Sequence, residues 1–242
     1  MVKLLSANEN RTVLQETIPE AMFGSISEKI ASGEAFSWCD VICIGPGLGK
    51  NHDAREILRS CLTDPRAVTK PIVIDADGLN LLSESEEYIE LLQKNAKVGR
   101  TIVLTPHPGE LLRLLKALRK DDALTMENLK AHLEEHASFI SEKLSVITVA
   151  KDARTIISQG SRTCVNVSGN SGLGTAGSGD VLAGIITSFL CQEASGDHFL
   201  ATCRAVRMHG LLGDVCAKKG FFGEHGVMAN DLCDAIKALE IR

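Results

Sequence analysis

The sequence predicts an α/β fold in which helices cover both faces of a largely parallel β-sheet. Along the 242 residues, short apolar runs rich in β-branched residues alternate with longer segments of helical periodicity. Strands buried on both faces give the first pattern, and the helices that connect them give the second. The length fits one domain, and an apolar fraction of 44% supplies a sizeable core. We therefore expect residues 1–242 to form a single domain.

The elements follow in a regular order. Five apolar runs predict buried strands: residues 2–6, 41–44, 72–74, 102–104 and 146–149. Seven segments predict helices: residues 54–61, 87–95, 110–118, 127–144, 181–190, 199–217 and 231–239. Two further short strands, residues 154–158 and 163–167, are joined by Gly160. They predict an antiparallel pair at one end of the sheet.

Composition excludes several classes of protein. The net charge is −5, no basic run is present, and the chain has one Trp and one Tyr, which argues against a nucleic-acid partner. The eight cysteines are scattered without metal-site spacing, as in proteins of a reducing compartment. No apolar run approaches the ~20 residues that span a bilayer, and the N-terminus lacks a signal-peptide pattern. We expect a cytoplasmic protein that contacts no membrane.

The stretch from Asn166 to Asp180 is the most informative part of the chain. It contains five glycines within eleven positions: Gly169, Gly172, Gly174, Gly177 and Gly179. Glycines permit positive φ and a close approach to a ligand, and the predicted helix that follows begins with unpaired amides that attract phosphate. We expect a phosphate site here. A plain loop with Asp180 as the helix N-cap is the alternative.

Asp180 lies where this loop meets the helix. A carboxylate is a poor phosphate ligand, because like charges repel. It is suited to remove the proton from a hydroxyl beside the phosphate that is transferred. We therefore predict that Asp180 is a general base.

Polar residues that follow the other strands come next, because ligands bind beyond the carboxyl ends of strands in open α/β sheets. Residues 45–50 match neither the dinucleotide fingerprint nor the P-loop, and a tight turn explains them equally well. Asp75 and Asp77 could hold Mg²⁺ indirectly or bind hydroxyls, although Asp77 could also be a helix cap.

Two further side chains follow strands. His107 stands between two prolines, which hold it rigidly, and no helical face there needs it, so we favour a functional role. Lys151 could meet phosphate as a point charge, or it could be an ordinary solvated hairpin residue.

Together and in this order, five segments resemble the ADP/ATP-dependent NAD(P)H-hydrate dehydratases of the ribokinase-like fold. They are residues 45–49, 75–80, 105–110, 151–155 and 169–180, and residues 209–214 and 226–232 also look like the family's C-terminal end. The Asp-Ala-Asp-Gly-Leu-Asn and His-Pro-Gly-Glu sequences favour the dehydratases over the vitamin and sugar kinases. The resemblance implies a three-layer α/β/α sandwich and a homo-oligomer.

The resemblance also implies a chemistry. The C6 hydroxyl of hydrated NADH or NADPH is phosphorylated from ADP or ATP, with Mg²⁺ as cofactor, and loss of the phosphate restores the nicotinamide ring. It makes Asp180 the base and a substrate contact. The implied nucleotide-binding residues are Lys151, Asp152, Ala153, Arg154, Thr155, Asn170, Ser171, Gly172, Leu173, Gly174, Thr175, Ala176, Gly177, Ser178 and Gly179. The implied substrate-binding residues are Gly47, Gly49, Asp77, Asn80, His107, Pro108, Gly109, Glu110 and Arg113.

The chain departs from the family pattern in two ways. Asp152 stands where the family usually has glycine, which places a negative charge near the nucleotide. Residues 1–6 look like the family's second strand, so we expect the family's first βα unit to be missing from this chain. Its absence would expose a sheet edge or an apolar helix face that a partner chain covers. Two other functions stay open: a vitamin-precursor or sugar kinase of the same fold, and a non-catalytic nucleotide-binding protein.

Overall fold

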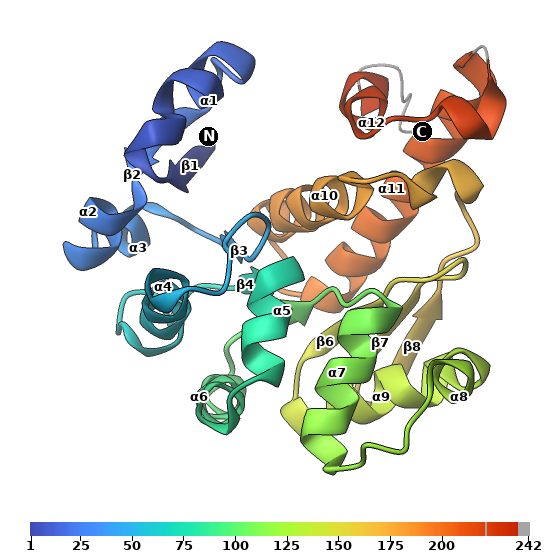
Figure 1. Cartoon of the computed structure of the whole chain (residues 1–242), viewed down its shortest axis with the longest axis horizontal. Helices are drawn as coiled ribbons and strands as arrows, with labels where there is room; N and C mark the ends of the chain where they lie inside the picture. The colour runs from blue at the N-terminus through green and yellow to red at the C-terminus, as the bar shows by residue number, and fades with distance from the viewer. Residues whose placement is uncertain (221, 237–242) are drawn as a thin grey trace.

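The computed structural model describes residues 1–220 and 222–236, and their main element is a six-stranded sheet (Figure 1). Its strands run in sequence order: β3 (Ile42–Ile44), β4 (Ile72–Ile74), β5 (Ile102–Leu104), β6 (Ile147–Ala150), β7 (Ile156–Gln159) and β8 (Arg162–Val165). The strands β3 to β6 are parallel, whereas β7 pairs antiparallel with both neighbours. The predicted parallel sheet with an antiparallel hairpin is confirmed.

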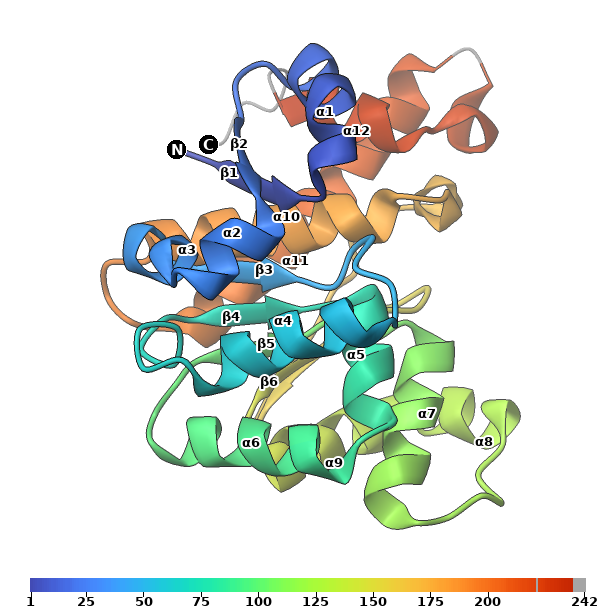
Figure 2. The same ribbon diagram turned by 60° about the vertical axis from the view of Figure 1, so that its left-hand side comes forward.

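Helices cover both faces of this sheet (Figures 1 and 2). One face carries α4 (His52–Thr63), α5 (Ala76–Ser83), α6 (Glu86–Lys97), α7 (Pro108–Arg119), α8 (Met126–Ala131) and α9 (Leu133–Leu144). The other carries α10 (Ser178–Gln192), α11 (His198–Lys219) and α12 (Ala229–Ala235). In β4, Ile72 and Ile74 belong to the core of the first face and Val73 to that of the second. This alternation between two cores explains the continuous apolar runs.

The first 38 residues form a separate layer (Figure 2). It contains β1 (Lys3–Ser6), α1 (Arg11–Thr17), β2 (Met22–Ser25), α2 (Ile26–Ala31) and α3 (Glu34–Trp38). The strands β1 and β2 pair in parallel as a sheet of their own. The strand predicted at residues 2–6 is present as β1, but all four of its residues are only half-buried and Val2 is 59% exposed, so the prediction that this strand is buried was wrong.

Other differences concern helices. The predicted helix at residues 127–144 is two helices, because His132 leaves the helical conformation with φ −125° and ψ 36°. Backbone hydrogen bonds from His132 to Asn128 and from His136 to His132 continue across the break, which preserves the apolar periodicity. The helix α5 was not predicted. Residue 239, the end of the last predicted helix, lies outside the described residues, in which α12 spans Ala229–Ala235.

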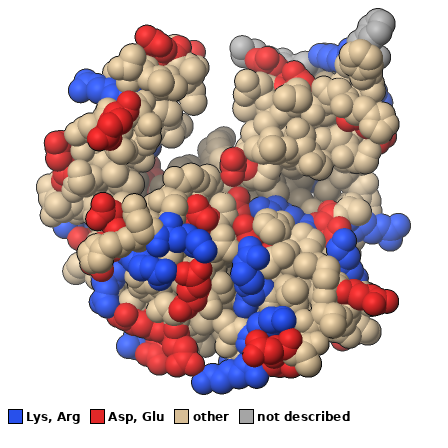
Figure 3. All heavy atoms as spheres, viewed as in Figure 1, with Lys and Arg blue, Asp and Glu red and all other residues tan. Residues whose placement is uncertain are grey.

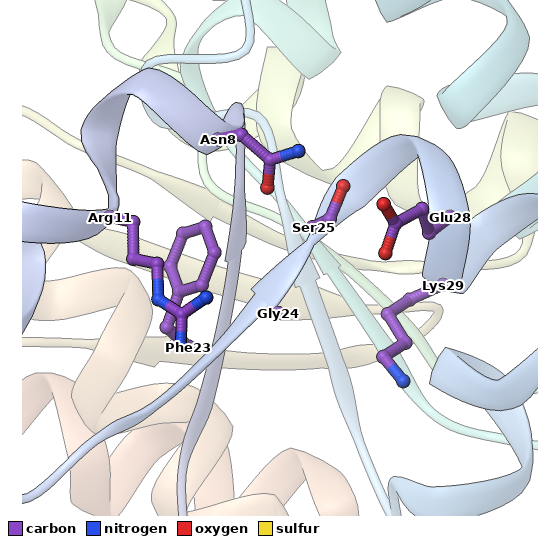
Figure 4. A pocket seen from close by; sticks show the side chains of 7 residues that line it. All are labelled: Asn8, Arg11, Phe23, Gly24, Ser25, Glu28 and Lys29. Atoms are coloured by element: carbon purple, nitrogen blue, oxygen red, sulfur yellow. The ribbon is translucent and has the colours of Figure 1, made fainter.

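The surface is hollowed beside the N-terminal layer and within it. Figure 3 shows a cleft between the N-terminal layer and the α11–α12 end, and acidic and basic side chains interspersed on this face. A cavity of about 400 Å³ lies within the N-terminal layer (Figure 4). It is lined by Asn8, Arg11, Phe23, Gly24, Ser25, Glu28 and Lys29. The described part of the chain has no helix both long and apolar enough to cross a membrane.

Candidate active site

The glycine-rich loop is attached to α11. The carboxylate of Asp214 accepts hydrogen bonds from the Gly169 amide and from Nδ2 of Asn170, both at 3.1 Å. The Asn170 Oδ1 in turn accepts from the Gly172 amide at 2.9 Å. These hydrogen bonds attach the start of the loop to α11 and define its conformation.

Two glycines of α11 allow the loop to lie directly against the helix. A Cβ on Gly210 would stand 2.2 Å from Oγ of Ser168, and a Cβ on Gly213 would stand 2.7 Å from Leu173. Our sequence analysis did not identify this contact. Its signal was the pair of glycines three residues apart inside a predicted helix, since such glycines often mark close packing.

Within the loop, the glycines serve different needs. Gly169 and Gly177 have φ of +100° and +85°, which side-chain-bearing residues rarely adopt. A Cβ on Gly172 would stand 2.5 Å from the Glu224 carbonyl oxygen, so this glycine is needed for space. The loop ends at Gly177, which is the N-cap of α10.

Asp180 is the third residue of α10, which begins at Ser178 and thus earlier than predicted. The alternative that Asp180 is the N-cap is therefore wrong. Its side chain is exposed at the end of the helix where amides lack intrahelical partners. The neighbouring protein still desolvates part of the carboxylate, and this partial burial raises the pKa of Asp180 above its ordinary value. The charges of Asp75 and Glu110 raise the pKa further, whereas Lys151 opposes them.

His209 of α11 is hydrogen-bonded to Ser178, the first residue of α10. Its Nε2 lies 3.0 Å from the Ser178 carbonyl oxygen and 3.2 Å from the Ser178 hydroxyl. Burial lowers the pKa of His209 to about 4, so the ring is neutral at pH 7 and donates to the carbonyl. The sequence had pointed to His209 only through the family resemblance.

Lys151 connects two loops of the site. Its Nζ forms a 2.7 Å ion pair with Asp75, whose side chain is 2% exposed. A Cβ on Gly179 would stand 3.3 Å from the same Nζ, so the ammonium lies beside the first turn of α10. The Lys151 amide also donates to the Pro106 carbonyl at 2.9 Å. The interpretation of Lys151 as a solvated hairpin residue is therefore wrong.

The rest of the segment from Lys151 to Thr155 forms the turn between β6 and β7. Asp152 accepts a hydrogen bond from the Ala153 amide at 2.8 Å, so its charge stabilises the turn itself. The Thr155 carbonyl accepts from the Asn166 amide at 2.9 Å. This bond brings the turn to the beginning of the glycine-rich loop, while Arg154 is exposed.

Four of the proposed substrate residues form one hydrogen-bonded chain. The Gly49 amide donates to Oδ2 of Asp77 at 3.0 Å, and Nδ2 of Asn80 donates to Oδ1 of Asp77 at 3.3 Å. The Nε of Arg113 completes it by donating to Oδ1 of Asn80 at 3.0 Å. These hydrogen bonds connect the three segments that follow adjacent parallel strands: the turn after β3, the helix α5 after β4 and the helix α7 after β5.

Asp75 and Asp77 therefore have different partners. Asp75 is the N-cap residue of α5 and faces Lys151, whereas Asp77 lies in the first turn and faces Gly49. Ala76 between them has φ +45°, an unfavourable conformation for a residue with a Cβ. The two carboxylates do not form a pair. Among the described residues, no group of three or more His, Cys, Asp or Glu side chains could hold a metal ion.

His107 caps α7. Its Nδ1 accepts from the Gly109 amide at 3.0 Å, and its own amide donates to Glu110 at 2.9 Å, which completes a capping box with Pro108 at the first helical position. The expectation that His107 has no helix to stabilise was wrong. Its side chain is still 51% exposed, and its Nε2 lies 3.2 Å from the 5%-exposed carboxylate of Glu110.

The turn after β3 lies close to the end of β4. Gly45 has φ +122°, and a Cβ there would stand 1.8 Å from the Asp75 carbonyl oxygen. Gly47 and Gly49 also have positive φ, and a Cβ on either would meet open space. Gly45 is therefore needed for the close packing of this turn against the end of β4, whereas Gly47 and Gly49 shape a part of the turn that has room for a ligand.

Comparison with known proteins identifies the relatives of this site. A family model described as NAD(P)H-hydrate dehydratase matches residues 1–238. The bifunctional NAD(P)H-hydrate repair enzyme Nnr of Thermofilum pendens is 34% identical over 235 residues, which cover 93% of this chain and 41% of that enzyme. The ADP-dependent (S)-NAD(P)H-hydrate dehydratase of Neisseria meningitidis is 33% identical over 225 residues, 93% of this chain and 69% of that protein.

A solved structure agrees with these matches. A ribokinase-like superfamily protein from Enterococcus faecalis superposes with a TM-score of 0.75 at 30% identity, covering 98% of this chain and 75% of that one. The chain thus spans less than half of the bifunctional enzyme and about two thirds of the ADP-dependent dehydratase. It belongs to the NAD(P)H-hydrate dehydratase family, whose fold is ribokinase-like.

Proposed function

We propose that this chain dehydrates hydrated NADH or NADPH at the expense of ADP or ATP and thereby repairs the damaged cofactor. The observation that carries the proposal is the position of Asp180. It stands in the first turn of α10, directly after the glycine-rich loop and close to the Lys151–Asp75 ion pair. A base, a cation and a helix N-terminus at one place suit transfer of a phosphoryl group to a hydroxyl.

The proposed nucleotide side consists of the turn from Lys151 to Thr155 and the loop from Asn170 to Gly179. The hydrogen bond between Thr155 and Asn166 brings the turn close to the chain that leads into the loop, and the Nζ of Lys151 lies beside Gly179 at the end of the loop. Amides of the loop would donate hydrogen bonds to the phosphates, and the ammonium of Lys151 would balance their charge. A non-catalytic nucleotide-binding protein would need the same loop but not a base beside it.

The proposed substrate side consists of the hydrogen-bonded residues Gly49, Asp77, Asn80 and Arg113, together with the exposed ring of His107. These groups offer hydrogen bonds and one cation to the hydroxyls and phosphates of a hydrated nicotinamide nucleotide. Asp180 would take the proton of the C6 hydroxyl as the hydroxyl oxygen attacks the terminal phosphorus of ADP or ATP, and the bond to the bridging oxygen would break to release AMP or ADP. Loss of the phosphate from C6, together with a proton from the neighbouring C5, would then restore the double bond of the ring.

Mg²⁺ fits this site as a companion of the nucleotide. The ion keeps several waters and binds largely through substrate phosphates, so it needs no dedicated protein cage. When bound, it would neutralise charge on the transferred group. We further propose that the chain acts as one catalytic domain, in the cytoplasm and as a homo-oligomer. Exposed apolar side chains of the N-terminal layer, among them Val13 and Trp38, support an interface there.

One assay tests the proposal. The chain is incubated with hydrated NADH and ADP or ATP, and the absorbance of the reduced nicotinamide is followed together with released phosphate. We expect recovery of absorbance that depends on nucleotide and stops in Asp180→Asn. Stable phosphorylation of a vitamin precursor without this recovery would identify a kinase instead, and nucleotide binding without turnover would identify a binding protein.

A further inference from the structure

Asp75 has no role in the proposed chemistry, yet its carboxylate is one of the most enclosed in the described chain. The side chain is 2% exposed at the carboxyl end of β4, where it pairs with Lys151 at 2.7 Å. Burying a carboxylate is costly unless it is paired, and such a pair is rarely kept for stability alone. We infer that Asp75 is a positioning residue that holds Lys151 against the first turn of α10 and maintains Asp180 as a base.

The first step of the argument is geometric. Lys151 follows β6 and Asp75 follows β4, so the ion pair spans β5 at the end of the sheet where ligands bind. The Nζ lies beside Gly179, within reach of any phosphate that occupies the end of α10. A lysine has a flexible stem with four carbons, and one fixed partner removes most of that freedom. Asp75 thus aims the ammonium before the nucleotide arrives.

The second step is electrostatic. Three charged groups from three different segments act on Asp180: Asp75 after β4, Lys151 after β6, and Glu110 in α7. Burial is the largest cause of the raised pKa of Asp180, and Asp75 is the next. Lys151 acts in the opposite direction. If Asp75 were neutral, Lys151 would be free to pair with Asp180 itself. This pairing would make Asp180 a weaker base, and it would leave the Lys151 ammonium unavailable to the phosphate.

The inference rests on the proposed function for its meaning, but its first test needs no turnover. Carboxyl ¹³C NMR can follow the titration of Asp180 in the wild-type chain, in Asp75→Asn and in Lys151→Gln. We expect the pKa of Asp180 to fall in Asp75→Asn, to rise in Lys151→Gln, and to lie between the two in the double variant. Asp77→Asn is the matched control, because it removes a carboxylate two residues away that faces Gly49, and it should leave the titration unchanged.

The second test measures ligands and rate. Calorimetry with ATP should show on the order of tenfold weaker binding in Asp75→Asn, with partial recovery in Asp75→Glu, which restores the charge. The acid limb of kcat/KM should move to lower pH in Asp75→Asn, and turnover at pH 7 should fall by roughly tenfold or more, because a weaker base is a poorer proton acceptor. If Asp75→Asn does not fold, Asp75→Ser replaces it in both tests.

The outcomes separate the two proposals. An Asp180 titration that is unchanged in Asp75→Asn, or that moves in the same direction in Asp75→Asn and Lys151→Gln, overturns the inference. Absence of dehydration in the wild-type chain, with the opposite shifts of Asp180 intact, rejects the proposed function and leaves the positioning role supported. Unchanged ATP affinity in Asp75→Asn would also overturn the claim that Asp75 aims Lys151.

Discussion

The N-terminal layer and the six-stranded sheet both combine parallel strands with helices, although the sheet ends in an antiparallel hairpin, and they differ in burial. All residues of β4 and β5 are buried, whereas β1 is half-buried throughout. The cavity of about 400 Å³ lies in the N-terminal layer, whereas the proposed base, the buried ion pair and the glycine-rich loop follow strands of the six-stranded sheet. That cavity and the proposed catalytic groups therefore lie in different regions, so side-chain chemistry, and not volume, supports the proposed site.

The largest effect should come from Asp180→Asn, which keeps the shape of the side chain but cannot accept a proton. We expect ATP affinity within a few-fold of wild type and turnover lower by ~10²–10⁴. Initial rates with hydrated NADH measure the loss of turnover, and ATP calorimetry measures the retained affinity. Arg11→Gln in the cavity of the N-terminal layer is the matched variant and should retain most activity. Turnover of Asp180→Asn close to that of wild type would remove the base from the mechanism.

Stability should show the same contrast between the two regions. Ile74→Ala removes a side chain that is fully buried in β4 and should cost about 2–5 kcal/mol of unfolding free energy. Leu4→Ala in the half-buried β1 should cost clearly less, because its surroundings are partly solvent already. Urea denaturation of both variants measures the difference. Equal losses would show that the N-terminal layer is as tightly coupled to the fold as the central sheet.

The neutral His209 predicts a pH dependence of stability. Its folded-state pKa of about 4 lies below the ordinary value of 6.5, so the unfolded chain binds the proton first as the pH falls. The resulting stability is complete above pH 6.5 and is lost between pH 6.5 and 4, by at most about 1.4 kcal/mol per pH unit. The variant His209→Gln should lack this component in melts across that range. His52→Gln, at a residue whose side chain is 86% exposed, should retain it.

The smallest effect that we expect concerns two glycines of α10. Gly179→Val places a branched side chain toward Lys151 at the proposed phosphate position and should weaken ATP binding by about tenfold, or 1.4 kcal/mol. Gly184→Val lies five residues further along the same helix, where a Cβ meets open space, and should leave binding unchanged. Calorimetry on the two variants separates the effect of the position in the helix from the effect of introducing valine. Matching affinities would argue against phosphate at the start of α10.

The sequence predicted what depends on local patterns. The strands at residues 72–74 and 102–104 were predicted with their observed bounds, because strands between two cores are apolar at every position. The helix after the glycine-rich loop was also predicted, although it starts three residues earlier than expected. The layer formed by residues 1–38 was largely missed, since half-buried elements carry a weaker periodicity.

Pairings between distant segments could not be predicted in this way. Lys151 and Asp75 are 76 residues apart, and nothing in either segment indicates the other. The contact of Gly210 with Ser168 depends on how α11 packs behind the loop, which periodicity does not describe. His107 was favoured as a functional residue for its rigid surroundings, but the helix cap that accounts for part of this rigidity became visible only in three dimensions.

The unfavourable conformation of Ala76 separates two tasks within three residues. A residue with a Cβ at φ +45° costs on the order of 1–3 kcal/mol, and Ala76→Gly would relieve part of it. With Ala76 in this conformation, the carboxylate of Asp75 faces Lys151 and that of Asp77 faces Gly49. The strained alanine thus separates the proposed donor side from the proposed acceptor side.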